Sequence, residues 1–168
     1  MSAMYEATVP TFTRAMTNLI HVLEKGAANA EARKIDPAVF ITSRLYPDMF
    51  PLSRQVQIVS DVSRLGTARL ALVEGPKFED NEVSFPDLVE RLRKTIAFLA
   101  TLKPGQFDDG SRMVTFPAQK ESYTWPGSRY LYQRVIPNVF FHCATSYNIL
   151  RHNGVEIGKA DFLGSLEG

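Results

Sequence analysis

The sequence predicts an all-α protein, a four-helix bundle with a long connection between its third and fourth helices. Four segments place apolar residues three and four positions apart, the period of an amphipathic helix. One long stretch between them, from Gly105 to Pro126, lacks this period and contains turn dipeptides. Because the chain has 168 residues and 45% hydrophobic content, we expect a single domain over residues 1–168.

The first two helices are predicted from their apolar spacing and their stop signals. We expect the first over about residues 5–25, with Gly26 as its stop, followed by a short helix over about residues 38–44. The second is expected to begin near Pro51 and to end before Gly75, which would take the left-handed conformation ahead of Pro76.

The third helix is predicted to begin at a capping box formed by Ser84 and Asp87, and to continue to Pro104. The connection that follows is expected either to hold a short hairpin, with strands near residues 112–116 and 121–125, or to act as a lid. Its aromatic residues would then cover a pocket or fill the core. We expect the fourth helix to run from about Tyr130 or Pro137 to Arg151.

Composition excludes several functional classes. Nineteen basic and eighteen acidic residues give a net charge of +1, and no basic stripe predicts a nucleic-acid partner. No apolar run is long enough for a signal peptide or a membrane span, so we expect no membrane partner. Cys143 is the only cysteine, which rules out an intrachain disulfide and favours a reducing, cytoplasmic location.

A line of polar residues on the fourth helix is the first candidate site. Residues three and four apart share a helix face, so the polar side chains of this line lie on an otherwise apolar helix. Its members are Asn138, His142, Thr145 and Ser146. On the second helix, Asp61 falls on the apolar face beside Ile58 and Leu65, where a carboxylate needs a partner.

We therefore predict that Asp61 faces His142, with three interpretations. The carboxylate would orient the imidazole so that His142 acts as a general base on a small molecule. Alternatively, both side chains would coordinate a divalent metal with a third ligand. The third interpretation is a core polar network that fixes the register of the helices.

Several segments resemble an uncharacterised family of domains of unknown function within the DinB/YfiT-like superfamily. They read RLYPDMFPLSRQVQIVSD, ALVEGP, FPDLVERLRKTIAFL and PNVFFHCATSYNILRHNGVEIGKADFLG, and the resemblance covers nearly the whole chain. It implies a DinB-like bundle. The superfamily comprises metal-dependent enzymes, several of which use low-molecular-weight thiols.

The resemblance also implies a metal site. In the superfamily, one histidine from helix two and an HxxxH pair on helix four bind a divalent metal. Here His142 matches the second histidine of the pair, Asn138 stands at the first, and Asp61 falls near the histidine of helix two. The implied metal ligands are His142 and Asp61, and the implied metal is Zn, Ni or Fe.

Two functional readings follow from different classes. In the first, the protein is a metal-dependent or general-base enzyme with catalytic His142 and Asp61, and with Asn138, Thr145 and Ser146 lining the ligand pocket. In the second, the bundle is a non-catalytic scaffold for binding or interaction. The resemblance, together with the broad apolar surface of the second helix, predicts a homodimer in either reading.

Overall fold

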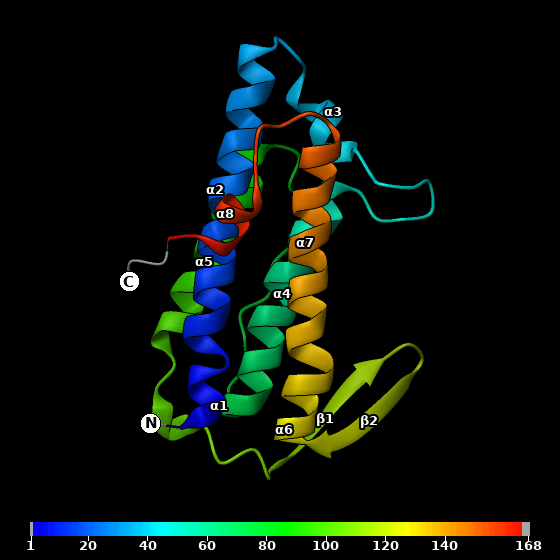
Figure 1. The fold of residues 1–168 in the computed structure, drawn as a ribbon. Coiled ribbons are helices and arrows are strands. Elements are labelled where there is room, and N and C mark those ends of the chain that lie inside the picture. Colours follow the sequence, from blue (N-terminus) through cyan, green and yellow to red (C-terminus); the bar gives the residue numbers. More distant parts are fainter. Residues whose placement is uncertain (1, 166–168) are drawn as a thin grey trace.

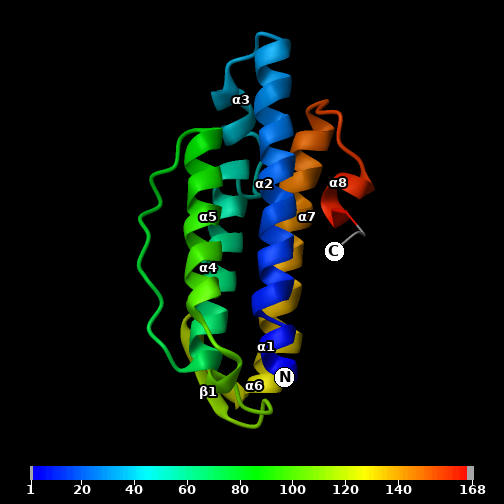
Figure 2. The same ribbon diagram turned by 90° about the vertical axis from the view of Figure 1, so that its left-hand side faces the viewer.

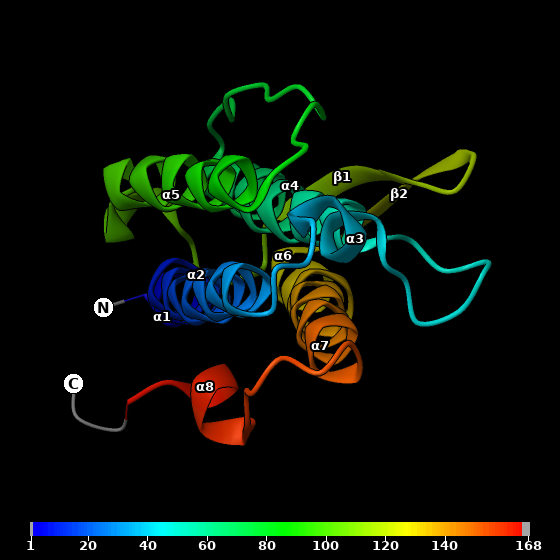
Figure 3. The ribbon, with the colours of Figure 1, turned by 90° about the horizontal axis from the view of Figure 1, so that it is seen from above.

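Four long helices of the computed structural model, which describes residues 2–165, lie side by side. They are α2 (Val9–Ala32), α4 (Leu52–Ala71), α5 (Phe85–Thr101) and α7 (Ile136–His152) (Figure 1). Helices α2 and α4 each pack against both α5 and α7. Seen along the bundle, the four helices surround a shared apolar core (Figure 3).

Shorter elements complete the fold. They are the helices α1 (Ala3–Glu6), α3 (Pro37–Thr42), α6 (Gly127–Tyr130) and α8 (Lys159–Leu163), a 3-10 turn (Pro104–Gln106) and a π-helix (Leu131–Val135). Strands β1 (Met113–Ala118) and β2 (Glu121–Pro126) form an antiparallel hairpin, in which Met113 pairs with Pro126. The protein is mostly helical, as predicted. The small sheet and the additional helices correct the strict all-α, four-helix description.

The connection that spans the length of the bundle is the one between α4 and α5. Helices α4 and α5 run in the same direction, so residues 72–84 return along their outer side (Figure 2). The hairpin between α5 and α7 projects from one end of the bundle instead (Figure 1). The hairpin strands predicted from sequence are confirmed, whereas the crossover along the bundle was not predicted.

Gly26 was predicted to stop the first helix, and that prediction is wrong. The residue is buried inside α2, which continues to Ala32. A Cβ at this position would lie 3.1 Å from the ring of Phe85 and 3.2 Å from Leu150. Glycine is therefore present because two other elements approach the α2 backbone closely.

Helix α4 ends before Gly75, as predicted, but a different residue takes the left-handed position. Leu72, not Gly75, adopts the left-handed conformation at the carboxyl end, with φ of 54°. Its N–H donates to the carbonyls of Ala68 and Arg69, and the N–H of Val73 also donates to the carbonyl of Ala68, so the last carbonyls of the helix have partners. At the start of α5, the predicted capping box of Ser84 and Asp87 is present in full.

Aromatic side chains of the hairpin fill the end of the core. Phe116 and Tyr130 are buried, with ring centroids 4.5 Å apart, and Trp125 meets Phe116 edge-on at 5.2 Å. This supports the core-filling interpretation of the connection over the lid. Within residues 2–165, every helix is too short or too polar to cross a bilayer.

Candidate functional site between helices α4 and α7

Helices α4 and α7 pack directly against each other, as the sequence predicted for its second and fourth helices. They run in opposite directions (Figure 1). The start of α4 therefore faces the middle of α7, where Gln55 meets His142. The end of α4 meets the π-helix that precedes α7. The close approach there requires Gly66, since a Cβ would lie 2.8 Å from a methyl group of Val135.

His142 is buried and hydrogen-bonded to a residue that the sequence analysis did not consider. Its Nδ1 lies 2.5 Å from Oε1 of Gln55, at the start of α4. The Gln55 amide is itself oriented, because its Nε2 donates to the carbonyl of Phe50. Since Oε1 can only accept, Nδ1 carries the proton and Nε2 carries the free lone pair.

The electrostatic surroundings keep His142 neutral. Burial, with a smaller contribution from the positive charge of Arg54, lowers the pKa of His142 from its usual 6.5 to about 4. At neutral pH the imidazole is therefore uncharged, and Nε2 is the ring nitrogen that can accept a hydrogen bond. Phe141 lies edge-on to the imidazole, with ring centroids 5.1 Å apart.

Asp61 does not form the predicted hydrogen bond with His142. Its Oδ1 accepts from Arg64 at 2.6 Å and from Arg91 of α5 at 2.8 Å. The carboxylate is turned toward α5 and the crossover, while Gln55 occupies the place opposite His142. The prediction failed because two arginines supply the charge that compensates Asp61, and helical spacing alone cannot show this.

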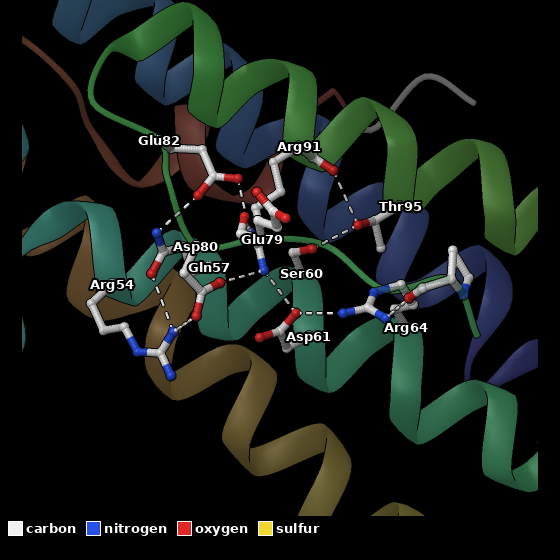
Figure 4. A network of polar contacts seen from close by, with 11 residues as sticks. Arg54, Gln57, Ser60, Asp61, Arg64, Glu79, Asp80, Glu82, Arg91 and Thr95 are labelled. Carbon is white, nitrogen blue, oxygen red and sulfur yellow. Dashed lines mark hydrogen bonds and ion pairs between the residues drawn. The ribbon is translucent and has the colours of Figure 1, made fainter. Parts of the chain in front are cut away.

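Asp61 belongs to a network that ties the crossover to the bundle (Figure 4). Arg91 is 2% exposed and contacts three carboxylates, those of Asp61, Asp80 and Glu82. Additional contacts join Arg54 to Asp80 and Gln57 to Glu82. Positive and negative side chains balance in this network, which suits a structural role.

Two of the predicted pocket residues are satisfied within their own helix. The hydroxyl of Thr145 donates to the carbonyl of Phe141, and that of Ser146 donates to the carbonyl of His142, both at 2.8 Å. Such bonds to the preceding turn leave no donor for a ligand. The polar line is therefore part structural, and of its members His142 and Asn138 remain as site candidates.

Asn138 lines a cavity of about 130 Å³, named the α4–α7 cavity here, between α4, β1 and the start of α7. Asp61 lines the same cavity, so the structure brings these two predicted residues together. Asn138 lies one helical turn before His142 on α7. The remaining polar lining comes from Arg69, Tyr130 and Arg134. The apolar walls are Val62, Leu65, Gly66, Phe116, Pro117 and Val135.

The two arginines distinguish this cavity from the balanced network beside it. Arg69 donates to the hydroxyl of Tyr130 at 3.2 Å. In the described residues, neither Arg69 nor Arg134 forms an ion pair with a carboxylate. Asp61 does not offset them, since Arg64 and Arg91 already neutralise it. The cavity therefore favours an anion.

The donors present do not suit a resident divalent metal. Over residues 2–165, no three His, Cys, Asp or Glu side chains lie close enough together to hold a metal ion. His142 has an available Nε2, but its neighbours Gln55 and Asn138 are weak amide ligands. Asp61, the second ligand implied by the resemblance, is bound to two cations.

The sequence contained a signal for one of the missed residues. Gln55 lies between Leu52, Val56 and Val59 on the apolar side of α4, where an uncharged polar side chain also needs a partner. Arg69 and Arg134 carried no such signal. Their proximity depends on the π-helix and the hairpin, which bring Tyr130 and Phe116 over the end of α4.

Comparison with known proteins identifies a family and a similar solved structure. The family model described as Domain of unknown function (DUF1993) matches residues 4–163. A crystal structure of a DinB family member protein from Shewanella denitrificans is similar to the chain, with a TM-score of 0.91 and 35% sequence identity. That similarity covers 98% of this chain and 93% of the other. No curated protein matches the sequence.

Proposed function

The chain belongs to the DUF1993 family of DinB-like proteins, and we propose that it binds a small organic anion in the α4–α7 cavity. One observation supports this most strongly. Two arginines, Arg69 and Arg134, line a cavity between facing helices and have no carboxylate partner among residues 2–165. Sites between the helices of a bundle are commonly built in this way.

The size and walls of the cavity restrict the ligand. A volume of 130 Å³ holds roughly four water molecules, so the enclosed part of the ligand is small. Phe116 and Tyr130 offer aromatic surfaces beside the arginines, and the amide of Asn138 offers both a donor and an acceptor. A carboxylate on a flat or short apolar group fits this combination.

If the protein is an enzyme, His142 would act as its general base. The residue lies one turn along α7 from Asn138, which is about 6 Å along the helix axis. Gln55 holds Nδ1 as a donor, so Nε2 would accept a proton from a bound hydroxyl or amine. With a pKa of about 4, His142 is a weak base, suited to a substrate whose proton becomes acidic in the transition state. This step uses no metal.

A matched pair of ligands tests the binding proposal. We expect benzoate to bind and neutral benzamide to bind much more weakly, in titrations followed by NMR of the 15N-labelled protein. Replacement of Arg134 by glutamine should weaken benzoate binding by about fivefold, equivalent to one exposed ion pair of about 1 kcal/mol. The single change Asn138→Ala should also weaken benzoate binding.

Arg129→Gln provides the control. Arg129 lies five residues before Arg134 but stacks on Trp125 outside the cavity, so its loss should leave the affinity for benzoate unchanged. Equal affinities for benzoate and benzamide, or an Arg134→Gln variant that binds like the wild type, would contradict the proposal.

A second candidate function is dimeric interaction, supported by exposed aromatic side chains. Tyr46 and Phe50 are 65% and 54% exposed, and both lie in the loop between α3 and α4 (Figure 1). Neighbouring exposed aromatics are typical of interaction surfaces. In this reading the bundle pairs with a second copy through that loop, whether or not the α4–α7 cavity binds a ligand.

A further inference from the structure

A second cavity lies on another face of α7, between α2, α7 and the carboxyl-terminal helix α8. It is named the α2–α7 cavity here and has a volume of about 220 Å³. Its residues on α7 follow each other at helical spacing, and all differ from those of the α4–α7 cavity. Most of the lining is apolar and includes Leu19, Val22, Phe140, Cys143 and Phe162, while Thr11, Arg14 and Asn18 supply its polar part.

Helix α8 lies across α2 and closes one side of this cavity (Figure 3). Asp161 of α8 pairs with Lys25 and His21 of α2, at 2.9 and 3.0 Å. Asn18 of α2 donates to the carbonyl of Phe162. The chain beyond α8 also passes close to Asn18, because Gly164 has φ of 74° and a Cβ there would lie 2.3 Å from Asn18 Oδ1. The cavity wall is thus a fixed part of the fold.

Arg14 stands at the rim of the cavity and is the only charged residue in its lining. The guanidinium donates to the carbonyls of Leu163 and Ser165. Among residues 2–165, no carboxylate lies within ion-pair distance of Arg14. An apolar enclosure whose rim carries one cation without a carboxylate partner among residues 2–165 matches a ligand that has an apolar body and a single negative charge.

Cys143 contributes to the inner wall as an apolar group. Burial raises the pKa of its thiol to about 12, so the sulfur stays protonated at neutral pH. Leu19 and Val22 are buried around it, and Tyr147 meets Phe162 edge-on, with ring centroids 6.0 Å apart. This wall offers contact to a chain of methylene groups and holds no charge to orient a polar ligand.

We propose that the α2–α7 cavity binds a linear aliphatic carboxylate of medium length, with its chain against Leu19, Val22 and Cys143 and its carboxylate on Arg14. The volume equals that of roughly seven water molecules, which suits a chain of about eight carbons. On binding, the carboxylate replaces main-chain carbonyls as the partner of the guanidinium, and the charged bond is the stronger of the two.

Isothermal titration with octanoate and with octan-1-ol tests this assignment. We expect one octanoate per chain and weaker binding of the alcohol. Arg14→Gln should lower the affinity for octanoate by about fivefold and leave that for octan-1-ol unchanged, since only the acid uses the guanidinium. Because Arg14 is an exposed residue of α2, this variant leaves the core intact.

A second variant tests the position of the chain. Ala15→Phe places a ring in the cavity from α2 and should abolish the binding of both ligands, while Ala97→Phe, at an exposed position of α5, should not. Arg134→Gln separates the two cavities, since it would weaken octanoate only if the acid bound between α4 and α7. Octanoate binding that is absent, unaffected by Arg14→Gln, or weakened by Arg134→Gln would overturn the proposal.

Discussion

His142 shows how one side chain is defined by its partner rather than by its own residue type. Its hydrogen bond to Gln55 leaves Nε2 as an acceptor, and its burial favours the neutral form. The sequence indicated that a polar residue at this position needs a partner. It did not indicate which one, because Asp61 and Gln55 both lie on largely apolar parts of α4. The choice depends on the rotation of α4 about its axis and on the arginines of α4 and α5.

The lowered pKa of His142 predicts a pH-dependent stability. Between pH 6.5 and 4, the unfolded chain binds a proton at this residue and the folded chain does not. The free energy of unfolding should therefore fall as the pH drops through this window, by an amount on the order of 3 kcal/mol. In His142→Gln, which retains a donor for Gln55, urea denaturation should show a smaller fall. The same replacement at the exposed His152 is the matched control.

At the scale of elements, the crossover between α4 and α5 depends on buried arginines. Arg91 contacts Asp61 of α4 and two carboxylates of the crossover. Arg91→Leu would leave these carboxylates without their shared cation, so we expect a loss of about 2 to 4 kcal/mol in the free energy of unfolding, reduced from a fully buried pair because the acids are partly exposed. Arg93→Leu, two residues along α5, removes only an exposed pair with Glu24 and should cost less than about 1 kcal/mol.

Limited proteolysis provides a second measurement on the same variants. If Arg91 holds the crossover, cleavage within residues 72–84 should be faster in Arg91→Leu than in Arg93→Leu. Equal rates and equal stabilities in the two variants would show that the network contributes nothing to the crossover.

The sequence predicted an element correctly where the residues that determine it lie close together in the chain. The capping box of Ser84 and Asp87 and the strands of the hairpin depend on residues close in sequence, and both were found. The reason for glycine at positions 26 and 66 could not be predicted from neighbouring residues in the sequence. Their conformations are helical, and the reason for glycine lies in Phe85 and Val135, which belong to other elements. The α4–α7 cavity was likewise missed in part, because Arg69 and Arg134 converge only through tertiary packing.

At the scale of the whole molecule, the two cavities use different faces of α7, and the exposed aromatic loop lies at a third place. Asn138 faces α4, whereas Phe140 and Cys143 face α2 and α8. Ligands in the two cavities therefore do not compete for the same side chains. The loop between α3 and α4 projects sideways from the upper half of the bundle, away from the hairpin at its lower end (Figure 1). Pairing through this loop would leave both cavities accessible.

This separation makes the proposed dimer testable without disturbing either cavity. A stable homodimer needs about 800 Å² from each partner, and the rings of Tyr46 and Phe50 would form the apolar centre of such a contact. We expect sedimentation velocity to show a dimer at micromolar concentration, and the double change Tyr46→Ser, Phe50→Ser to raise its dissociation constant at least about tenfold, or 1.4 kcal/mol. Met113 and Tyr132 are also exposed but lie at the hairpin end, so serine at both of these positions is the matched control and should leave the dimer intact. A wild-type protein that sediments as a monomer would contradict the proposed dimer. A dimer that persists in the loop variant and dissociates in the control would show that the interface lies at the hairpin end instead.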